Sequence, residues 1–74
     1  MEKYKNSSGK SGVDSYEIKT DSIIIKFTDG VNYLFSHIKP GKIEVDKLKA
    51  LAVSGVGLNS YINSKIKKNY EKKF

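Results

Sequence analysis

Apolar and polar residues alternate along residues 22–35, and this alternation predicts a β-hairpin together with its register. All of the apolar positions share one face only if the loop has three residues, Thr28-Asp29-Gly30, with Gly30 in the left-handed conformation of a β-bulge. A loop of two residues would place Tyr33 and Phe35 on the opposite face from the apolar residues of the first strand. The pattern therefore favours the three-residue loop and predicts a core face made of Ile23, Ile25, Phe27, Val31, Tyr33 and Phe35.

The rest of the chain predicts one further strand and two helices. Tyr16 and Ile18 alternate as a short first strand, which leads through a turn at Thr20-Asp21 into the hairpin. After Pro40-Gly41 the apolar spacing becomes helical, and it resumes after the break at residues 54–57. The expected fold class is α+β, with a three-stranded antiparallel β-meander followed by two helices packed on one face of the sheet (β-β-β-α-α). The helical apolar positions are Val45, Leu48, Leu51 and Ala52, then Leu58, Tyr61, Ile62 and Ile66.

Composition and length predict how the chain is organised. Residues 1–10 lack apolar spacing and are expected to form a flexible N-terminal arm, and residues 11–74 to form a single small domain. A chain of this length buries only about 60% of the surface that its unfolded form exposes, and it has no cysteine for a disulfide. Self-association is one way in which such a domain gains stability. Ile24 and Leu34 lie on the sheet face opposite the helices, so a homo-oligomer stays an open alternative.

The charge of the chain is strongly positive and is concentrated near the C-terminus. The net charge is +6, with fourteen lysines and no arginine. Residues 60–74 contain five lysines against Glu71 alone. A basic end beside a near-neutral body is typical of proteins that contact phosphates, although basic tails also keep small domains soluble. Because lysine acts as a point charge, binding of nucleic acid through it is expected to be sensitive to salt and weak in sequence preference.

The second helix carries the candidate phosphate site. Lys65, Lys68 and Lys72 are spaced i, i+3 and i+7, which would align them beside the buried stripe of this helix. The alternative is an ordinary solvated helix face. Polar residues of the same segment would form hydrogen bonds with the ligand, and aromatic residues would stack on its bases. The candidate residues along this segment are Tyr61, Asn63, Lys65, Lys67, Lys68, Lys72 and Lys73, with Tyr70 as a further stacking residue.

The loop before the second helix offers a second way to hold a phosphate. Gly55 and Gly57 would expose backbone amides to an anion at the helix start, with Asn59 close by. Glycines at such a position also serve simply to end one helix in a left-handed turn and to reverse the chain. We favour the turn, and the two roles are compatible.

Catalysis, metal binding and membrane binding have little support in the sequence. His37 is the only histidine and there is no cysteine, so no nucleophile with its base and no metal-ligand set is evident. The chain is therefore expected not to be an enzyme and not to need a cofactor. No apolar run approaches the ~20 residues that span a bilayer, and the basic helix lacks Trp or Phe on its apolar side. We expect a cytoplasmic protein with no membrane contact.

The chain carries, in this order, the short motifs Phe27-x-x-Gly30, Tyr33-x-Phe35, Gly57-Leu58-Asn59 and Tyr61-Ile62-Asn63. In these motifs it resembles the KTSC domain, a small bacterial domain found at the C-terminus of some lysyl-tRNA synthetases and also as short free-standing proteins. The free-standing proteins are the members that this chain resembles most. The aromatic-x-aromatic motif of that family falls on Tyr33 and Phe35, and its helix motif on Ile62, Asn63 and Ile66. The resemblance covers about residues 11–70 and implies RNA binding. Other residues that carry it are Ser11, Gly12, Val13, Tyr16, Leu51, Ala52 and Tyr70.

Three functions stay open from the sequence. The first is a non-enzymatic binding module that contacts RNA or single-stranded nucleic acid through the lysine-rich C-terminal helix. The second is an oligomer that sequesters a small, for example cyclic, nucleotide. The third is a protein-interaction or inhibitory module that uses the open sheet face. A polymer-binding surface is expected to weaken steeply with salt, whereas a nucleotide pocket saturates at a fixed ratio.

Overall fold

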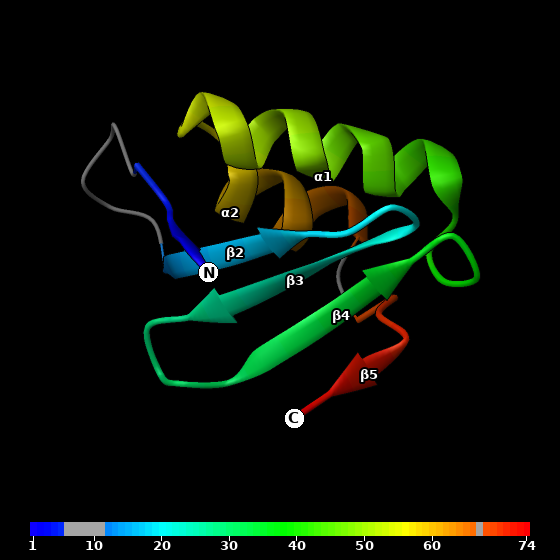
Figure 1. Ribbon diagram of the computed structural model, residues 1–74, viewed down its shortest axis with the longest axis horizontal. Helices are drawn as coiled ribbons and strands as arrows, with labels where there is room; N and C mark the ends of the chain where they lie inside the picture. Colours follow the sequence, from blue (N-terminus) through cyan, green and yellow to red (C-terminus); the bar gives the residue numbers. More distant parts are fainter. Residues whose placement is uncertain (6–11, 67) are drawn as a thin grey trace.

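The computed structural model describes residues 1–5, 12–66 and 68–74, and it shows a small α+β domain with two helical segments on one side of an antiparallel sheet (Figure 1). The predicted α+β class is confirmed. The strands follow one another in the order of the sequence: β1 (Glu2–Lys3), β2 (Val13–Ile18), β3 (Ser22–Phe27), β4 (Asn32–Ser36) and β5 (Lys72–Lys73). The helices are α1 (Lys42–Ser54) and α2 (Leu58–Tyr61), which continues directly into a π-helical turn, η1 (Ile62–Ile66).

The sheet has five strands, so the expectation of three was wrong. The three expected strands form its centre as β2, β3 and β4, and β1 and β5 are added at the two edges. Each added strand has two charged or polar residues, Glu2–Lys3 and Lys72–Lys73. A segment of two residues cannot show an alternating pattern, so neither edge strand was detectable from apolar spacing.

Residues 1–5 are part of the folded domain. β1 pairs with β2, and Tyr4 is only 3% exposed. The Tyr4 N–H donates to the Asp14 carbonyl at 3.0 Å, and the Tyr4 hydroxyl accepts the Leu58 N–H at 3.2 Å. The expectation of a flexible arm over residues 1–10 is therefore not met at its first five residues. Residues 6–10 lie outside the described part of the chain.

The predicted hairpin register is confirmed. Ile23 pairs with Phe35 and Ile25 with Tyr33. The Phe27 N–H donates to the Val31 carbonyl at 3.0 Å, which leaves a loop of three residues. Gly30 has a φ of +88°, the left-handed conformation that the bulge requires and that other residues adopt at a cost.

The core lies between the inner face of the sheet and the helices. Val45, Leu48 and Ala52 point from α1 onto the sheet and are buried, as their spacing predicts. Leu58, Ile62 and Ile66 fill the same layer from the second helix. Ile24 and Leu34 lie on the opposite face of the sheet, pair with each other and are half-buried.

The second helix ends earlier than expected. Its regular and π-helical parts together end at Ile66, whereas the lysine spacing had placed Lys72 on the same helix. The Asn69 N–H donates to the Ile66 carbonyl at 3.0 Å in a turn, and the chain then returns beside β4 as β5. The Glu71 N–H donates to the Leu34 carbonyl at 2.8 Å, and Phe74 exchanges two backbone hydrogen bonds with Asn32. Pairing with the open edge of β4 therefore replaces further helix in this segment.

No helical segment within the described ranges has the length and apolar character needed to cross a membrane.

Candidate functional site

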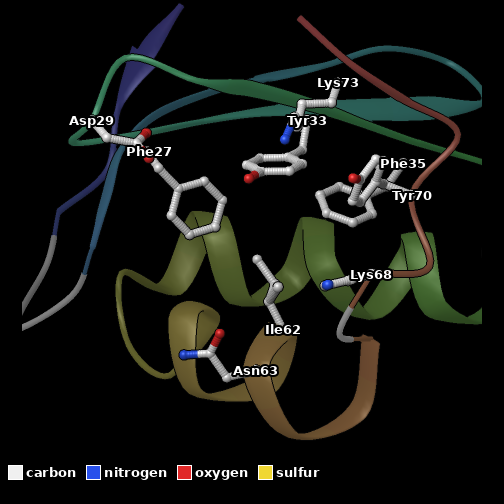
Figure 2. A pocket seen from close by; sticks show the side chains of 9 residues that line it. All are labelled: Phe27, Asp29, Tyr33, Phe35, Ile62, Asn63, Lys68, Tyr70 and Lys73. Atoms are coloured by element: carbon white, nitrogen blue, oxygen red, sulfur yellow. The ribbon is translucent and has the colours of Figure 1, made fainter.

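A pocket of about 280 Å³ opens where the inner face of the sheet, the second helix and the C-terminal segment meet (Figure 2). Its lining residues come from β3, the hairpin loop, β4, η1 and the C-terminal segment. Its walls combine aromatic rings, one aliphatic side chain and four polar or charged groups. The lining residues are Phe27, Asp29, Tyr33, Phe35, Ile62, Asn63, Lys68, Tyr70 and Lys73.

Tyr33 is at the centre of the aromatic wall. Its ring centroid lies 5.2 Å from that of Phe27 and 4.9 Å from that of Tyr70, and both pairs meet edge to face. Phe27, Tyr33 and Phe35 share this wall because the three-residue loop puts alternate residues of β3 and β4 on the same face of the sheet. The Phe35 ring lies nearly parallel to that of Tyr33, at an interplanar angle of 26° and with the centroids 6.4 Å apart. These contacts hold the four rings in place.

One face of the Tyr33 ring is directed at Ile62. Figure 2 shows the Tyr33 ring above and the Ile62 side chain below, with Phe27 on one side and Phe35 and Tyr70 on the other. Tyr33 is half-buried, and Ile62 is nearly fully buried in the core. We refer to the part of the pocket between this aromatic surface and this aliphatic surface as the slot.

Two ammonium groups border the slot. Lys68, which follows η1, extends its side chain toward the middle of the pocket (Figure 2). Lys73 pairs with Tyr33 in the sheet, so its side chain emerges on the pocket side next to that ring. Neither lysine takes part in a salt bridge among the residues that the structure describes, where Lys19–Glu17 and Lys42–Asp46 are the ion pairs. Both charges are therefore free for an anionic ligand.

Asp29 supplies a carboxylate at the other end of the pocket. It lies in the hairpin loop beside Phe27, on the far side of Tyr33 from Lys68 in Figure 2. Its Oδ1 atom accepts the Val31 N–H at 3.0 Å, which holds the side chain against the loop. Asp29 is not recognisable as a site residue from the sequence, because only the tertiary fold brings the loop to the same pocket as the second helix.

The predicted lysine row on one helix face does not form. Lys65 is exposed on η1 and is not part of the pocket wall. Lys72 pairs with Leu34, so it lies on the opposite sheet face from Lys73, and its Nζ is 5.6 Å from the Phe74 ring centroid. Lys67 lies outside the described residues. Of the predicted basic residues in the described ranges, the fold brings Lys68 and Lys73 to one site, and Asn63 joins them.

Tyr61 lies away from the pocket. Its hydroxyl donates to Oε1 of Glu44 on α1 at 2.8 Å, and Lys47 Nζ is 6.0 Å from its ring centroid. The hydrogen bond to the Glu44 carboxylate raises the pKa of Tyr61, with partial burial and the negative charge adding to the effect. Tyr61 thus ties the second helix to α1, and Tyr70 supplies the aromatic ring at the pocket instead.

The glycine loop forms a turn, as favoured from the sequence. Gly55 has a φ of +77° and its N–H donates to the Leu51 carbonyl at 3.1 Å, so it ends α1. Gly57, with a φ of +81°, precedes α2. The Leu58 N–H at the helix start is already bonded to the Tyr4 hydroxyl. Asn59 lies near Gly12, where an added Cβ would be 3.6 Å from its Oδ1 atom.

Six of the pocket residues were not assigned to a binding site from the sequence alone, or were given only a minor part in one: Phe27, Asp29, Tyr33, Phe35, Ile62 and Tyr70. Phe27 and Tyr33 were assigned to the core by their alternation, and they do contact it while also facing the pocket. Tyr70 was named only as a further stacking residue. The signal that points to Asp29 is its place in the tight loop next to the aromatic face.

The described residues contain no cluster of three or more His, Asp or Glu side chains placed to hold a metal ion.

Comparison of the chain with protein-family models, with curated proteins and with solved structures finds no match. The resemblance to the KTSC domain therefore stays a prediction from the sequence motifs.

The hydrogen bond between Tyr61 and Glu44 predicts a distinct pH dependence of stability. Tyr61→Phe is expected to lower the free energy of unfolding by about 1 kcal/mol at neutral pH. Because folding raises the pKa of Tyr61, the stabilisation is complete below the unfolded-state value of about 10 and is lost as the pH rises through the folded-state value. Urea unfolding between pH 8 and 11 measures this, and the difference between the wild type and Tyr61→Phe should shrink above about pH 10.

Tyr16→Phe is the matched control, because Tyr16 is also half-buried but its hydroxyl makes no hydrogen bond within the described ranges. A constant difference between the wild type and Tyr61→Phe across this pH range would show that the bond to Glu44 is not formed in solution.

Proposed function

We propose that this protein is a non-enzymatic binding module for RNA or single-stranded nucleic acid that holds one unpaired nucleotide in the pocket. The base lies in the slot between Tyr33 and Ile62, and the adjacent phosphates contact Lys68 and Lys73. The observation that carries this proposal is that one pocket combines an aromatic wall with two unpaired ammonium groups. Proteins that bind single strands use the same combination of stacking and positive charge.

The energetics of these groups favour an unpaired nucleotide over a duplex. Stacking of one base on an aromatic side chain contributes about 1–3 kcal/mol, and the slot admits one flat ring. A paired base has both faces covered by its neighbours and cannot enter the slot. The surrounding charge adds attraction at longer range, since the chain carries a net charge of +6.

A fluorescently labelled RNA of eight nucleotides tests the proposal by anisotropy at several salt concentrations. We expect Lys68→Gln/Lys73→Gln to bind at least tenfold more weakly than the wild type. Two lost phosphate contacts should also reduce the slope of log K against log salt by about 1.4, since each contact to a single strand contributes about 0.7.

Lys65→Gln is the matched control, because Lys65 is an exposed lysine close in sequence that does not line the pocket. It removes one positive charge and should change the affinity much less than either single change at Lys68 or Lys73. Equal losses from Lys65→Gln and Lys68→Gln would mean that the lysines act only through the overall charge, and the pocket would then not be the site.

A free small nucleotide is the second candidate, and the size of the pocket is compatible with it. Pockets for small molecules usually have volumes of about 300–1,000 Å³, and this pocket, at about 280 Å³, is close to the lower end of that range. Isothermal titration with a mononucleotide, compared with RNA strands of different length, distinguishes a free nucleotide from a nucleic acid as the ligand. Saturation at one nucleotide per chain with little salt dependence favours the nucleotide, whereas binding that strengthens with RNA length favours the polymer.

A further inference from the structure

The pocket has an uneven charge distribution along its length. Asp29 and Phe27 are at the end near the hairpin loop, whereas Phe35 and Tyr70 are at the other end, and Lys68 extends from that side toward the middle (Figure 2). The carboxylate and the Lys68 ammonium group therefore lie on opposite sides of Tyr33 within one small pocket.

The Asp29 carboxylate is fixed and has acceptor capacity left. Its Oδ1 atom receives the Val31 N–H, and its Oδ2 atom has no hydrogen bond or salt-bridge partner in the described ranges. An ionised carboxylate is an acceptor only, and it binds groups that present N–H donors. A phosphate placed at this end would be repelled by the carboxylate. The charges in the pocket therefore also determine the orientation in which a nucleotide binds.

We infer that the pocket selects a nucleotide whose base presents N–H donors at its edge, guanine above all, with that edge on Asp29 and the phosphate on Lys68. This inference rests on the proposed function and adds a base preference to it. Guanine carries a ring N–H beside an amino group, so it can donate twice to one carboxylate. Adenine and cytosine carry only an amino group, and uracil places a carbonyl on each side of its N–H. Reading of this edge is typical of proteins that bind unpaired bases.

Asn63 extends the polar contacts of the slot. It is exposed on η1 at the side of the pocket where Phe27 lies, and its amide offers both donors and an acceptor. It can bond either to a base carbonyl or to the sugar. An amide can bond to hydrogen-bond donors as well as to acceptors of the base. The preference for a base that presents N–H donors therefore depends on Asp29.

Isothermal titration with GMP, IMP, AMP and UMP tests the inference. The wild type should bind GMP most tightly, and IMP, which lacks the amino group, should bind more weakly. Asp29→Asn keeps an oxygen for the Val31 N–H but loses the charge, and it should weaken GMP binding about tenfold while leaving UMP binding nearly unchanged. Asp21→Asn, at an exposed acid in a distant turn, is the matched control.

A comparison of three ligands shows whether the nucleotide is bound as part of RNA or as a free molecule. An oligouridine of eight residues with a single guanine near its middle is compared with the all-uridine strand and with free GMP. Tighter binding of the guanine-containing strand, abolished by Asp29→Asn, supports recognition within RNA. Tighter binding of GMP than of that strand supports capture of the free nucleotide, again with the base edge on Asp29.

The outcomes distinguish this inference from the proposed function. Equal affinity for all four nucleotides, with no effect of Asp29→Asn, overturns the base preference and leaves the binding module intact. Stronger binding of UMP than of GMP does the same. No binding of any nucleotide or strand, by a protein shown to be folded by circular dichroism, overturns both.

Discussion

Tyr4→Ala is expected to lower the free energy of unfolding by about 3–5 kcal/mol, the range for removal of a large buried aromatic side chain. Tyr4 is 3% exposed and belongs to the core although it is the fourth residue of the chain. A domain of this length has a stability of roughly 4–11 kcal/mol, so much of it would be lost. Urea unfolding followed by circular dichroism measures the change.

Tyr4→Phe separates packing from hydrogen bonding at the same position. It keeps the ring but removes the hydroxyl that accepts the buried Leu58 N–H. Leaving that donor unpaired costs about 1–3 kcal/mol, so the loss should be clearly smaller than for Tyr4→Ala. If Tyr4→Ala were as stable as the wild type, residues 1–5 would be a detached arm in solution, as the sequence alone indicated.

Leu48→Ala is expected to lower the free energy of unfolding by about 3 kcal/mol. Leu48 is fully buried and lies at the middle of α1, where it packs on the inner face of the sheet. The substitution keeps a good helix former, so the loss reflects the missing contacts and the cavity that remains. Chemical denaturation at neutral pH provides the value.

Ile43→Ala is the matched control on the same helix, because Ile43 is 83% exposed. Its replacement should change the stability by no more than about 0.5 kcal/mol. Similar losses at the two positions would mean that α1 is rotated about its axis relative to the arrangement described above.

The centre of the fold was predictable because local patterns determine it. The register of the hairpin follows from the alternation of six apolar residues and from one glycine at the end of the loop, and Gly30 has the conformation that this register needs. The stripe of Val45, Leu48 and Ala52 likewise identifies the buried side of α1. In both cases residues that are close in sequence carry the whole signal.

The edges of the fold were not predictable in the same way. β1 and β5 have only charged residues, and both depend on pairing with strands that are not adjacent to them in sequence. The lysine spacing after Ile66 is compatible with a helix, but the unpaired edge of β4 offers hydrogen bonds to the returning chain. Long-range pairing therefore overrides a helical pattern that no buried apolar residue supports.

The candidate site was predicted in part. Asn63, Lys68 and Lys73 were selected for their chemistry, and the fold brings them together. Lys65, Lys72 and Tyr61 were selected by the same reasoning, and they do not line the pocket. Lys72 lies in β5 because the helix ends at Ile66, whereas Tyr61 contacts α1 and Lys65 is exposed on η1. The aromatic wall and Asp29 come from the hairpin, and no local pattern indicates that the hairpin loop faces the C-terminal segment.

Amide NMR spectra of the isotope-labelled protein, recorded during addition of a short single-stranded RNA at about physiological salt, test most directly whether the pocket is the binding site. We expect the largest shift changes at the amides of Tyr33, Asn63, Lys68, Tyr70 and Lys73. Changes confined to the outer sheet face around Ile24 and Leu34, or no change with any RNA, would contradict the proposed role of the pocket.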